Sequence, residues 1–192
     1  MTACKSDTPL WLALDRRALI AWRTLAHTPA GDRIAAAMSS VADHGRGWVA
    51  AGAAGAILDP GRRRRWVSAV GVVLVAEQAS RQIKRSVRRP RPQLDGLEPL
   101  AGVTARYSFP SSHTATAVAA IYAFQGLLPR AGLVAWALLT AVSRPYLGVH
   151  YPSDVAFGAL LGATVGKAGQ AVTDRLSGVL VRPYPAGHGV RR

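Results

Sequence analysis

Residues 155–172 read VAFGALLGATVGKAGQAV, and Lys167 is the only charged residue among them. A helix of this length spans about 27 Å, close to the thickness of the hydrocarbon core of a bilayer. Gly158, Gly162 and Gly166 recur every fourth residue, which places them on one helix face where another helix can approach closely. The stretch therefore predicts a membrane-spanning helix that packs against a neighbour through small residues.

Three other apolar stretches precede this one, at residues 66–83, 114–128 and 131–142. Together the four predict an all-α fold, a polytopic transmembrane helical bundle. Residues 48–58 are apolar but short, so their status as a span stays open. Residues 10–26 mix large apolar with charged side chains, as an interfacial amphipathic helix or a helix on the surface of a soluble protein does.

Composition supports a membrane protein with an anionic partner. The 192 residues are 49% apolar and 18% charged, and the net charge is +14, which suits nucleic acid, anionic lipid or a phosphorylated substrate. The single cysteine, Cys4, excludes an internal disulfide framework and a thiolate metal site. We expect no cleaved secretory signal, and we divide the chain into an interfacial segment (1–30), a transmembrane domain (31–176) and a flexible basic tail (177–192).

Following the chain through the four spans brings its polar motifs to one membrane face. Arg62–Arg65 and the segment 84–91 flank the same helix, so they lie on opposite sides. The two following spans return His113, Arg144 and His150 to the side of Lys84. The arginines of the tail fall on the other side, and the positive-inside rule then makes the motif face extracytoplasmic. The arginines of segment 84–91 argue for the reverse orientation.

The motif residues are of the types that phosphoryl transfer requires. Arginine forks and a lysine can neutralise a phosphate dianion, and the two serines stand where a helix begins, with backbone N–H groups available to an anion. We predict a phosphate pocket at one membrane face whose phosphate-binding residues are Lys84, Arg91, Ser111, Ser112 and Arg144.

Two histidines and one carboxylate supply the remaining chemistry. Asp154 follows His150 by four residues, so its carboxylate can fix one ring nitrogen and leave the other to attack phosphorus. His113 is the candidate acid for the leaving group and the base for water. Asp154 is the only acidic residue in these motifs, so we predict a metal-independent reaction with no cofactor. Taken singly, the arginine run is typical of a membrane anchor and each histidine of a structural residue; their convergence favours catalysis.

The spacing of these residues resembles the type 2 phosphatidic acid phosphatase superfamily. The stretch from Lys84 to Pro92 matches its first motif, a lysine followed by Arg-Pro after six residues. Pro-Ser-Ser-His at 110–113 resembles the Pro-Ser-Gly-His of the second motif. The third motif, Ser-Arg, five residues, His, three residues, Asp, matches residues 143–154.

The resemblance implies a helical bundle in which His150 is the nucleophile, Asp154 its partner and His113 the general acid. It implies that the five phosphate-binding residues named above hold the substrate. One residue departs from the pattern, because Ser112 stands where the family usually has glycine. We expect this serine to change the fit of the substrate without abolishing activity.

We expect the substrate to be a polyprenyl-linked lipid phosphate in the bilayer, as for the bacterial polyprenyl phosphate and diphosphate phosphatases that this chain resembles. Phosphatidylglycerophosphate and phosphatidate are alternatives. A vanadium-dependent haloperoxidase shares the pocket but has a much longer soluble chain. A basic membrane protein that binds anionic lipid without catalysis is a further alternative. Nucleic-acid binding is not expected, because the cations lie at helix ends and not on a basic face outside the membrane.

Overall fold

The computed structural model describes residues 9–25, 28–42, 45–94, 96–97, 99–102 and 105–180. These residues fold into α-helices joined by turns and loops, with no β-strand in the described ranges apart from isolated bridges, so the prediction of an all-α fold is confirmed. The elements in chain order are α1 (Leu10–Leu25), α2 (Pro29–Ala42), α3 (Arg46–Leu58), the 3-10 helix η2 (Pro60–Arg62), α4 (Arg63–Val87), α5 (Ser112–Ala123), α6 (Arg130–Tyr146) and α7 (Pro152–Leu180).

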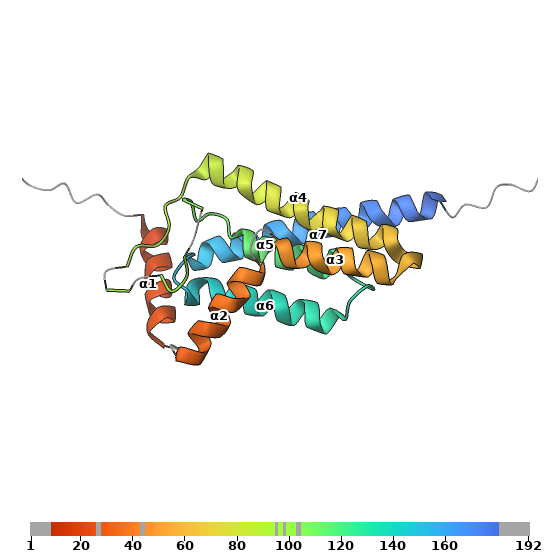
Figure 1. The fold of residues 1–192 in the computed structure, drawn as a ribbon. Coiled ribbons are helices and arrows are strands. Elements are labelled where there is room, and N and C mark those ends of the chain that lie inside the picture. The colour runs from red at the N-terminus through yellow and green to blue at the C-terminus, as the bar shows by residue number, and fades with distance from the viewer. Residues whose placement is uncertain are drawn as a thin grey trace, which may run out of the picture.

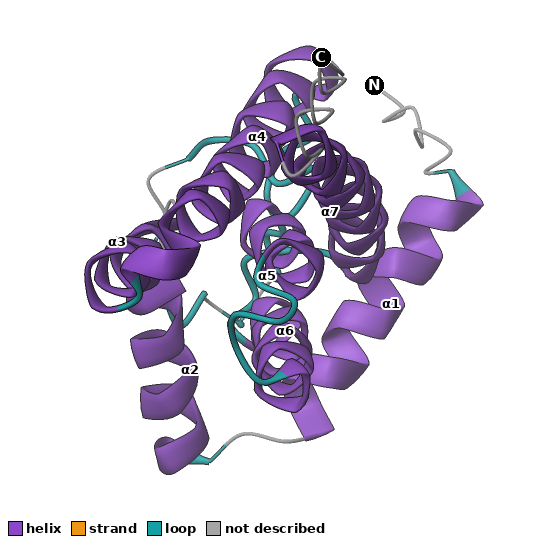
Figure 2. Cartoon of the chain, turned by 90° about the vertical axis from the view of Figure 1, so that its right-hand side faces the viewer, coloured by secondary structure: helices purple, strands orange, loops and turns teal. Residues whose placement is uncertain are grey.

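Helix α5 lies at the centre of the bundle, and α4, α6 and α7 pack around it (Figure 2). Its buried residues are small, among them Ala115, Ala119 and Ala120, so its neighbours approach its backbone closely. Helix α3 packs on the outside of α4. Residues 48–58, whose status as a span the sequence leaves open, therefore belong to a helix on the outside of the bundle.

The glycines of α7 face α5, as their spacing predicts. A Cβ added to Gly158 would meet the carbonyl oxygen of Ser111 at 2.5 Å, and one added to Gly162 would collide with the carbonyl of Ala115. Only a hydrogen atom fits at these positions, because the backbone of α5 occupies the space that a side chain would need. The glycine stripe thus fixes the separation of α7 from the start of α5.

Bulky side chains fill the end of the bundle away from the motifs. Trp66 of α4 and Trp48 of α3 contact Phe124, with ring centroids 6.0 and 5.4 Å apart. Leu133 of α6 belongs to the same buried cluster. Helices α3, α4, α5 and α6 run side by side in the bundle (Figure 1), and this apolar packing secures one end of it.

Helix α1 packs with its polar stripe inward. Asp15, Leu19 and Arg23 follow one another at four-residue spacing and are buried against the bundle, whereas Trp11 and Leu14 are exposed. Arg23 donates to the backbone carbonyl of Tyr146, and the bonds of Asp15 are described below. The helix therefore contacts the protein through charged groups and turns an apolar face outward, the pattern of an interfacial helix.

The predicted spans correspond to α4, α5, α6 and α7, with one difference in length. Helix α5 ends at Ala123 and not at Leu128, because the chain turns at Gly126 with a φ of 76°. Its 12 residues reach only about 18 Å, less than a bilayer core. In the described part of the chain, Pro152–Leu176 is the one helical segment long and apolar enough to span a membrane alone. The number of spans stays a prediction.

The two internal limits of the predicted domain division, at residues 30/31 and 176/177, fall within helices α2 and α7. Helix α7 continues to residue 180, four residues into the predicted tail, and residues 181–192 lie outside the described part. Helix α2 begins at Pro29, just before the predicted start of the transmembrane domain. The division itself stays a prediction.

Candidate active site

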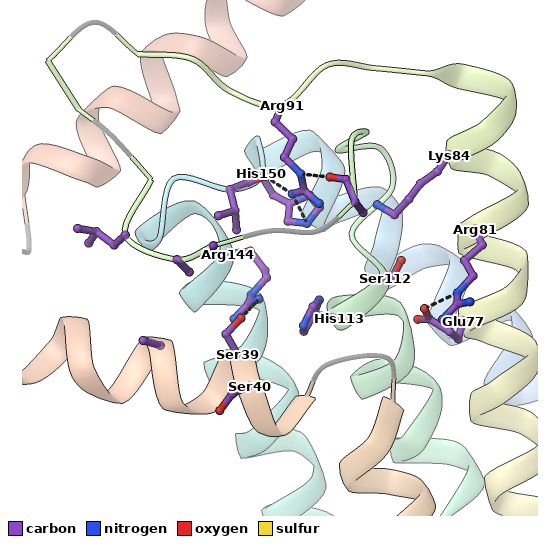
Figure 3. A pocket seen from close by; sticks show the side chains of 16 residues that line it. Ser39, Ser40, Glu77, Arg81, Lys84, Arg91, Ser112, His113, Arg144 and His150 are labelled. Carbon is purple, nitrogen blue, oxygen red and sulfur yellow. Dashed lines mark hydrogen bonds and ion pairs between the residues drawn. The ribbon is translucent and has the colours of Figure 1, made fainter.

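A cavity of about 470 Å³ opens at the end of the bundle where the three motifs meet (Figure 3). Six of the predicted site residues line it, and they come from three helices and two loops. Their gathering at one end agrees with the path of the chain through the four predicted spans. They are Lys84, Arg91, Ser112, His113, Arg144 and His150.

His150 stands between a carboxylate and a cation. Its Nδ1 lies 3.5 Å from Oδ2 of Asp154, and its Nε2 lies 3.5 Å from Nη1 of Arg91 at the cavity. Both separations exceed an ordinary hydrogen bond, as is common at catalytic sites without substrate. The loop from Leu147 to Tyr151 places the ring so that one nitrogen faces a negative group and the other faces the cavity.

Burial makes the neutral form of His150 dominant. Only 3% of the residue is exposed, and this desolvation, together with the charges of Arg91 and Lys84, lowers the pKa to about 4, against the opposing effect of Asp154. A neutral imidazole keeps a lone pair on the nitrogen that is not protonated. At neutral pH the ring is therefore in the state that a nucleophile requires.

Asp154 is held in place by groups on both sides. Its Oδ2 accepts from the backbone N–H of Tyr151 at 2.9 Å, and its Oδ1 accepts from Arg89 Nη1 at 2.8 Å. Asp154 stands in the first turn of α7, where the helix dipole favours a carboxylate. It lies behind His150 and not on the cavity wall, as expected for a residue that orients the ring.

Arg89 connects this carboxylate to helix α1, a link that the motif analysis missed. Its Nη2 donates to Asp15 at 2.7 Å, its Nη1 also donates to the Ser153 hydroxyl at 2.7 Å, and its guanidinium stacks on the Tyr151 ring at 4.0 Å. Asp15 accepts in turn from the backbone N–H of Ser153 at 3.0 Å. Nothing in the sequence around Asp15 indicates this contact, which joins residues 138 positions apart.

Arg91 and Lys84 tie the loop between α4 and α5 to the site. Arg91 donates to the carbonyl oxygens of Ala105 and Val149, both at 2.7 Å. Lys84 donates to the carbonyl of Ser108 at 3.0 Å and to that of Pro110. Both cations line the cavity while fixing the loop that leads to the second motif.

Arg144 is the most deeply buried of the cations among the predicted phosphate ligands, with 2% of the residue exposed. Its Nε and Nη2 donate to Ser143 Oγ at 3.1 and 2.9 Å, and its Nη1 donates to Ser39 Oγ of helix α2 at 3.0 Å. The guanidinium is thus held in one orientation at the cavity wall. Preorganised cations of this kind stabilise developing negative charge without reorganising.

The start of α5 forms another wall of the cavity. Ser111 is the N-cap residue, and its hydroxyl accepts from the backbone N–H of Thr114 at 3.4 Å. Ser112 and His113 follow in the first turn, where free N–H groups and the helix dipole attract anions. Ser111 itself is fully buried and is not among the cavity-lining residues, so its direct contact with phosphate stays a prediction.

Four further polar residues line the cavity outside the motifs: Ser39, Ser40, Glu77 and Arg81. The acidic residue within the apolar stretch 66–83 was a signal that could have identified Glu77. The two serines carry no such signal, because the position of α2 depends on long-range packing. Among the described residues no group of three or more histidine, cysteine or acidic residues could hold a metal ion, and metal independence stays a prediction.

Comparison with known proteins gives a consistent family. Residues 65–176 match the model of the PAP2 superfamily. Decaprenylphosphoryl-5-phosphoribose phosphatase of Mycolicibacterium smegmatis is 43% identical over 128 residues, which cover 65% of this chain and 69% of that protein. The protein of the same name from Mycobacterium tuberculosis is 42% identical over 146 residues, covering 73% of this chain and 77% of that one.

A solved structure shares the fold. It is described as the first transmembrane PAP2 type phosphatidylglycerolphosphate phosphatase from Bacillus subtilis, and it superposes with a TM-score of 0.74 at 19% identity. The match covers 88% of this chain and 89% of that one. The predicted family and the predicted class of enzyme, a lipid phosphatase, are confirmed. This chain, with its three motifs gathered at one cavity, belongs to the PAP2 superfamily.

Proposed function

We propose that this protein is a multi-pass membrane phosphatase that removes the terminal phosphate from a polyprenyl-phosphoryl-pentose phosphate through a phosphohistidine on His150. The observation that carries the mechanism is the position of His150, with Nδ1 toward Asp154 and Nε2 toward Arg91 and the cavity (Figure 3). The names of the mycobacterial relatives support the substrate class.

In the first half-reaction the lone pair of His150 Nε2 attacks phosphorus and the bond from phosphorus to the sugar oxygen breaks. His113 gives its proton to the departing oxygen, so the pentosyl lipid leaves as an alcohol. Arg91, Arg144 and Lys84 carry the charge on the phosphoryl oxygens. Asp154 stabilises the positive charge that forms on the ring.

In the second half-reaction the phosphoryl group returns to water. His113, now neutral, takes a proton from a water molecule, and the resulting oxygen attacks phosphorus while the P–N bond breaks. Inorganic phosphate leaves and His150 regains its lone pair. The residues of the site therefore account for both halves of the reaction.

The test is phosphate release by detergent-purified protein in EDTA, with His150→Ala measured alongside. The substrates are a polyprenyl-phosphoryl-pentose phosphate, a polyprenyl diphosphate, phosphatidylglycerophosphate and phosphatidate. We expect release in chelator, fastest from the pentose lipid, with a loss of at least about a thousandfold in the variant. Faster turnover of another lipid would overturn the substrate class, and an active His150→Ala would overturn the mechanism.

A further inference from the structure

A carboxylate lies among the cations of the cavity. Glu77 belongs to helix α4, within the apolar stretch predicted to span the membrane, and only 6% of it is exposed. An ionised group in such a position is costly, so it is retained where it performs a function. The reaction described above assigns none to it.

Its ion pair with Arg81 does not explain the burial of Glu77. Arg81 Nε donates to Glu77 Oε1 at 2.9 Å, but 43% of the Arg81 side chain is exposed against 8% for Glu77. Solvent can hydrate Arg81 without help, whereas the buried carboxylate needs a cation. The ion pair therefore stabilises the buried carboxylate of Glu77 more than it stabilises the exposed guanidinium of Arg81. Oε2 of Glu77 has no bonding partner among the described residues, so the carboxylate can still accept hydrogen bonds from a ligand.

Glu77 lies on the same face of α4 as the predicted phosphate ligand Lys84. Seven residues make two helical turns, so their Cα atoms are separated by about 10 Å along the axis. The cavity of about 470 Å³ extends over this distance and is within the range of about 300–1,000 Å³ that holds a small-molecule ligand. A phosphate group at Lys84 fills only part of it.

The hydroxyl group of Ser112, at the start of α5, lies in the part of the cavity near Glu77, between Glu77 and Lys84 (Figure 3). Ser39 and Ser40 of α2 lie on the other side of the cavity, where Ser39 accepts from Arg144 and Ser40 donates to the carbonyl oxygen of Ala37. Ser112 is the residue that departs from the family pattern, so this chain has an added hydroxyl at this place. A carboxylate with nearby hydroxyls accepts and donates hydrogen bonds but repels a second phosphate.

We propose that Glu77 and Ser112 form a subsite for the hydroxyl groups of a sugar, next to the phosphate-binding cations. The proposal rests on the proposed function, since it takes the cations as the phosphate site. The sugar hydroxyls donate to Glu77 and exchange hydrogen bonds with Ser112. A ligand without hydroxyl groups leaves the buried carboxylate without a hydrogen-bond donor. A ligand that carries hydroxyl groups should therefore bind more tightly than one that lacks them.

Binding of two soluble phosphates tests the subsite without requiring turnover of any lipid. Dissociation constants of pentose 5-phosphate and of pentyl phosphate are measured on the detergent-purified full chain by calorimetry. We expect wild-type protein to prefer the pentose ester at least tenfold. Glu77→Gln should reduce that preference ratio at least tenfold, and Ser112→Gly should reduce it by a smaller factor.

Asp174→Asn is the matched control, because it removes the same charge from an exposed position on α7 at the far end of the bundle. Its preference ratio should equal that of the wild type. Equal affinity of wild type for the two esters, or an unchanged ratio in Glu77→Gln, would overturn the subsite. Failure of the proposed function has a separate signature, the absence of phosphate release from the pentose lipid by protein that still binds the soluble esters.

Discussion

Arg89 Nη1 donates to Oδ1 of Asp154 at 2.8 Å, while the other oxygen of that carboxylate faces His150. The same guanidinium reaches Asp15 at 2.7 Å through Nη2. Asp154 therefore lies between the proposed nucleophile, His150, and an arginine that holds the carboxylate in place. In the proposed mechanism the orientation of His150 depends on this second contact as well as on the motif residues.

Replacing Arg89 by Gln should lower both stability and turnover. The side chains of Arg89 and Asp15 are 10% and 7% exposed, and breaking a buried pair by removing one partner costs about 3–5 kcal/mol. We expect a lower melting temperature in detergent and a kcat at least tenfold below wild type. Arg85→Gln, on the exposed surface of α4, is the control. An Arg89→Gln protein with wild-type kcat would show that the contact has no part in positioning Asp154.

His113→Ala should let the phosphoenzyme accumulate. If His113 activates the water of the second half-reaction, its loss slows hydrolysis of the phosphohistidine by about 10²–10⁴-fold. A substrate labelled with radioactive phosphate should then mark the protein with an acid-labile, base-stable group, and His113→Ala/His150→Ala should remain unlabelled. Labelling that persists in the double variant would place the phosphoryl group on another residue.

His150 should remain neutral in mildly acidic solution. Burial and neighbouring cations lower its pKa to about 4 from the ordinary value near 6.5, so the deprotonated form is favoured at every pH above about 4. We expect the ¹⁵N resonances of His150, assigned with His150→Ala, to show a neutral ring at pH 5.5. A titration midpoint at or above 6.5 would contradict the buried environment of the ring.

Gly158→Ala should displace the start of α5. An added Cβ meets the Ser111 carbonyl oxygen at 2.5 Å, so α7 and the helix that carries His113 must separate. We expect a loss of stability of about 1–3 kcal/mol and a reduced kcat. The control is Gly71→Ala on α4, where an added Cβ meets nothing within 4 Å. That variant should be neutral or slightly stabilised, because alanine favours a helix over glycine.

The two ends of the bundle should differ in their access from outside the cell. In a Cys4→Ser background, Arg106→Cys lies at the site end and Arg64→Cys at the opposite end. If the site face is extracytoplasmic, a membrane-impermeant maleimide should label the cysteine at 106 in intact cells and the one at 64 only after lysis. The reverse pattern would place the active site in the cytoplasm.

The gathering of the motif residues at one end of the bundle could be predicted from the order of the helices along the chain. Lys84 and His113 stand near helix ends, and Arg91 and His150 stand in the loops between helices, so this order sends all four to one face. Their roles in catalysis stay a prediction. The length of α5 was overestimated, since the apolar character of residues 124–128 continues past the turn at Gly126. Apolar composition shows which residues avoid water, and it does not show where a helix stops.

The contacts made by the first two helices could not be predicted in the same way. Asp15 is linked to Asp154 through Arg89, and Ser39 accepts directly from Arg144. Both contacts exist only because α1 and α2 pack on the bundle. No periodicity specifies that packing, because α1 buries a charged stripe and exposes apolar side chains. Sequence patterns assign such a helix the opposite orientation, with its charged groups in water.

The contacts of Arg89 and Arg144 extend beyond the part of the chain that matches the family model. Residues 65–176 contain all three motifs, yet Asp15 and Ser39 lie before that range and hold Arg89 and Arg144 in position. A fragment cut at the start of the family match would retain every motif residue and lose one partner of each of these two arginines. A fusion or a shortened chain intended to carry this activity should therefore keep helices α1 and α2.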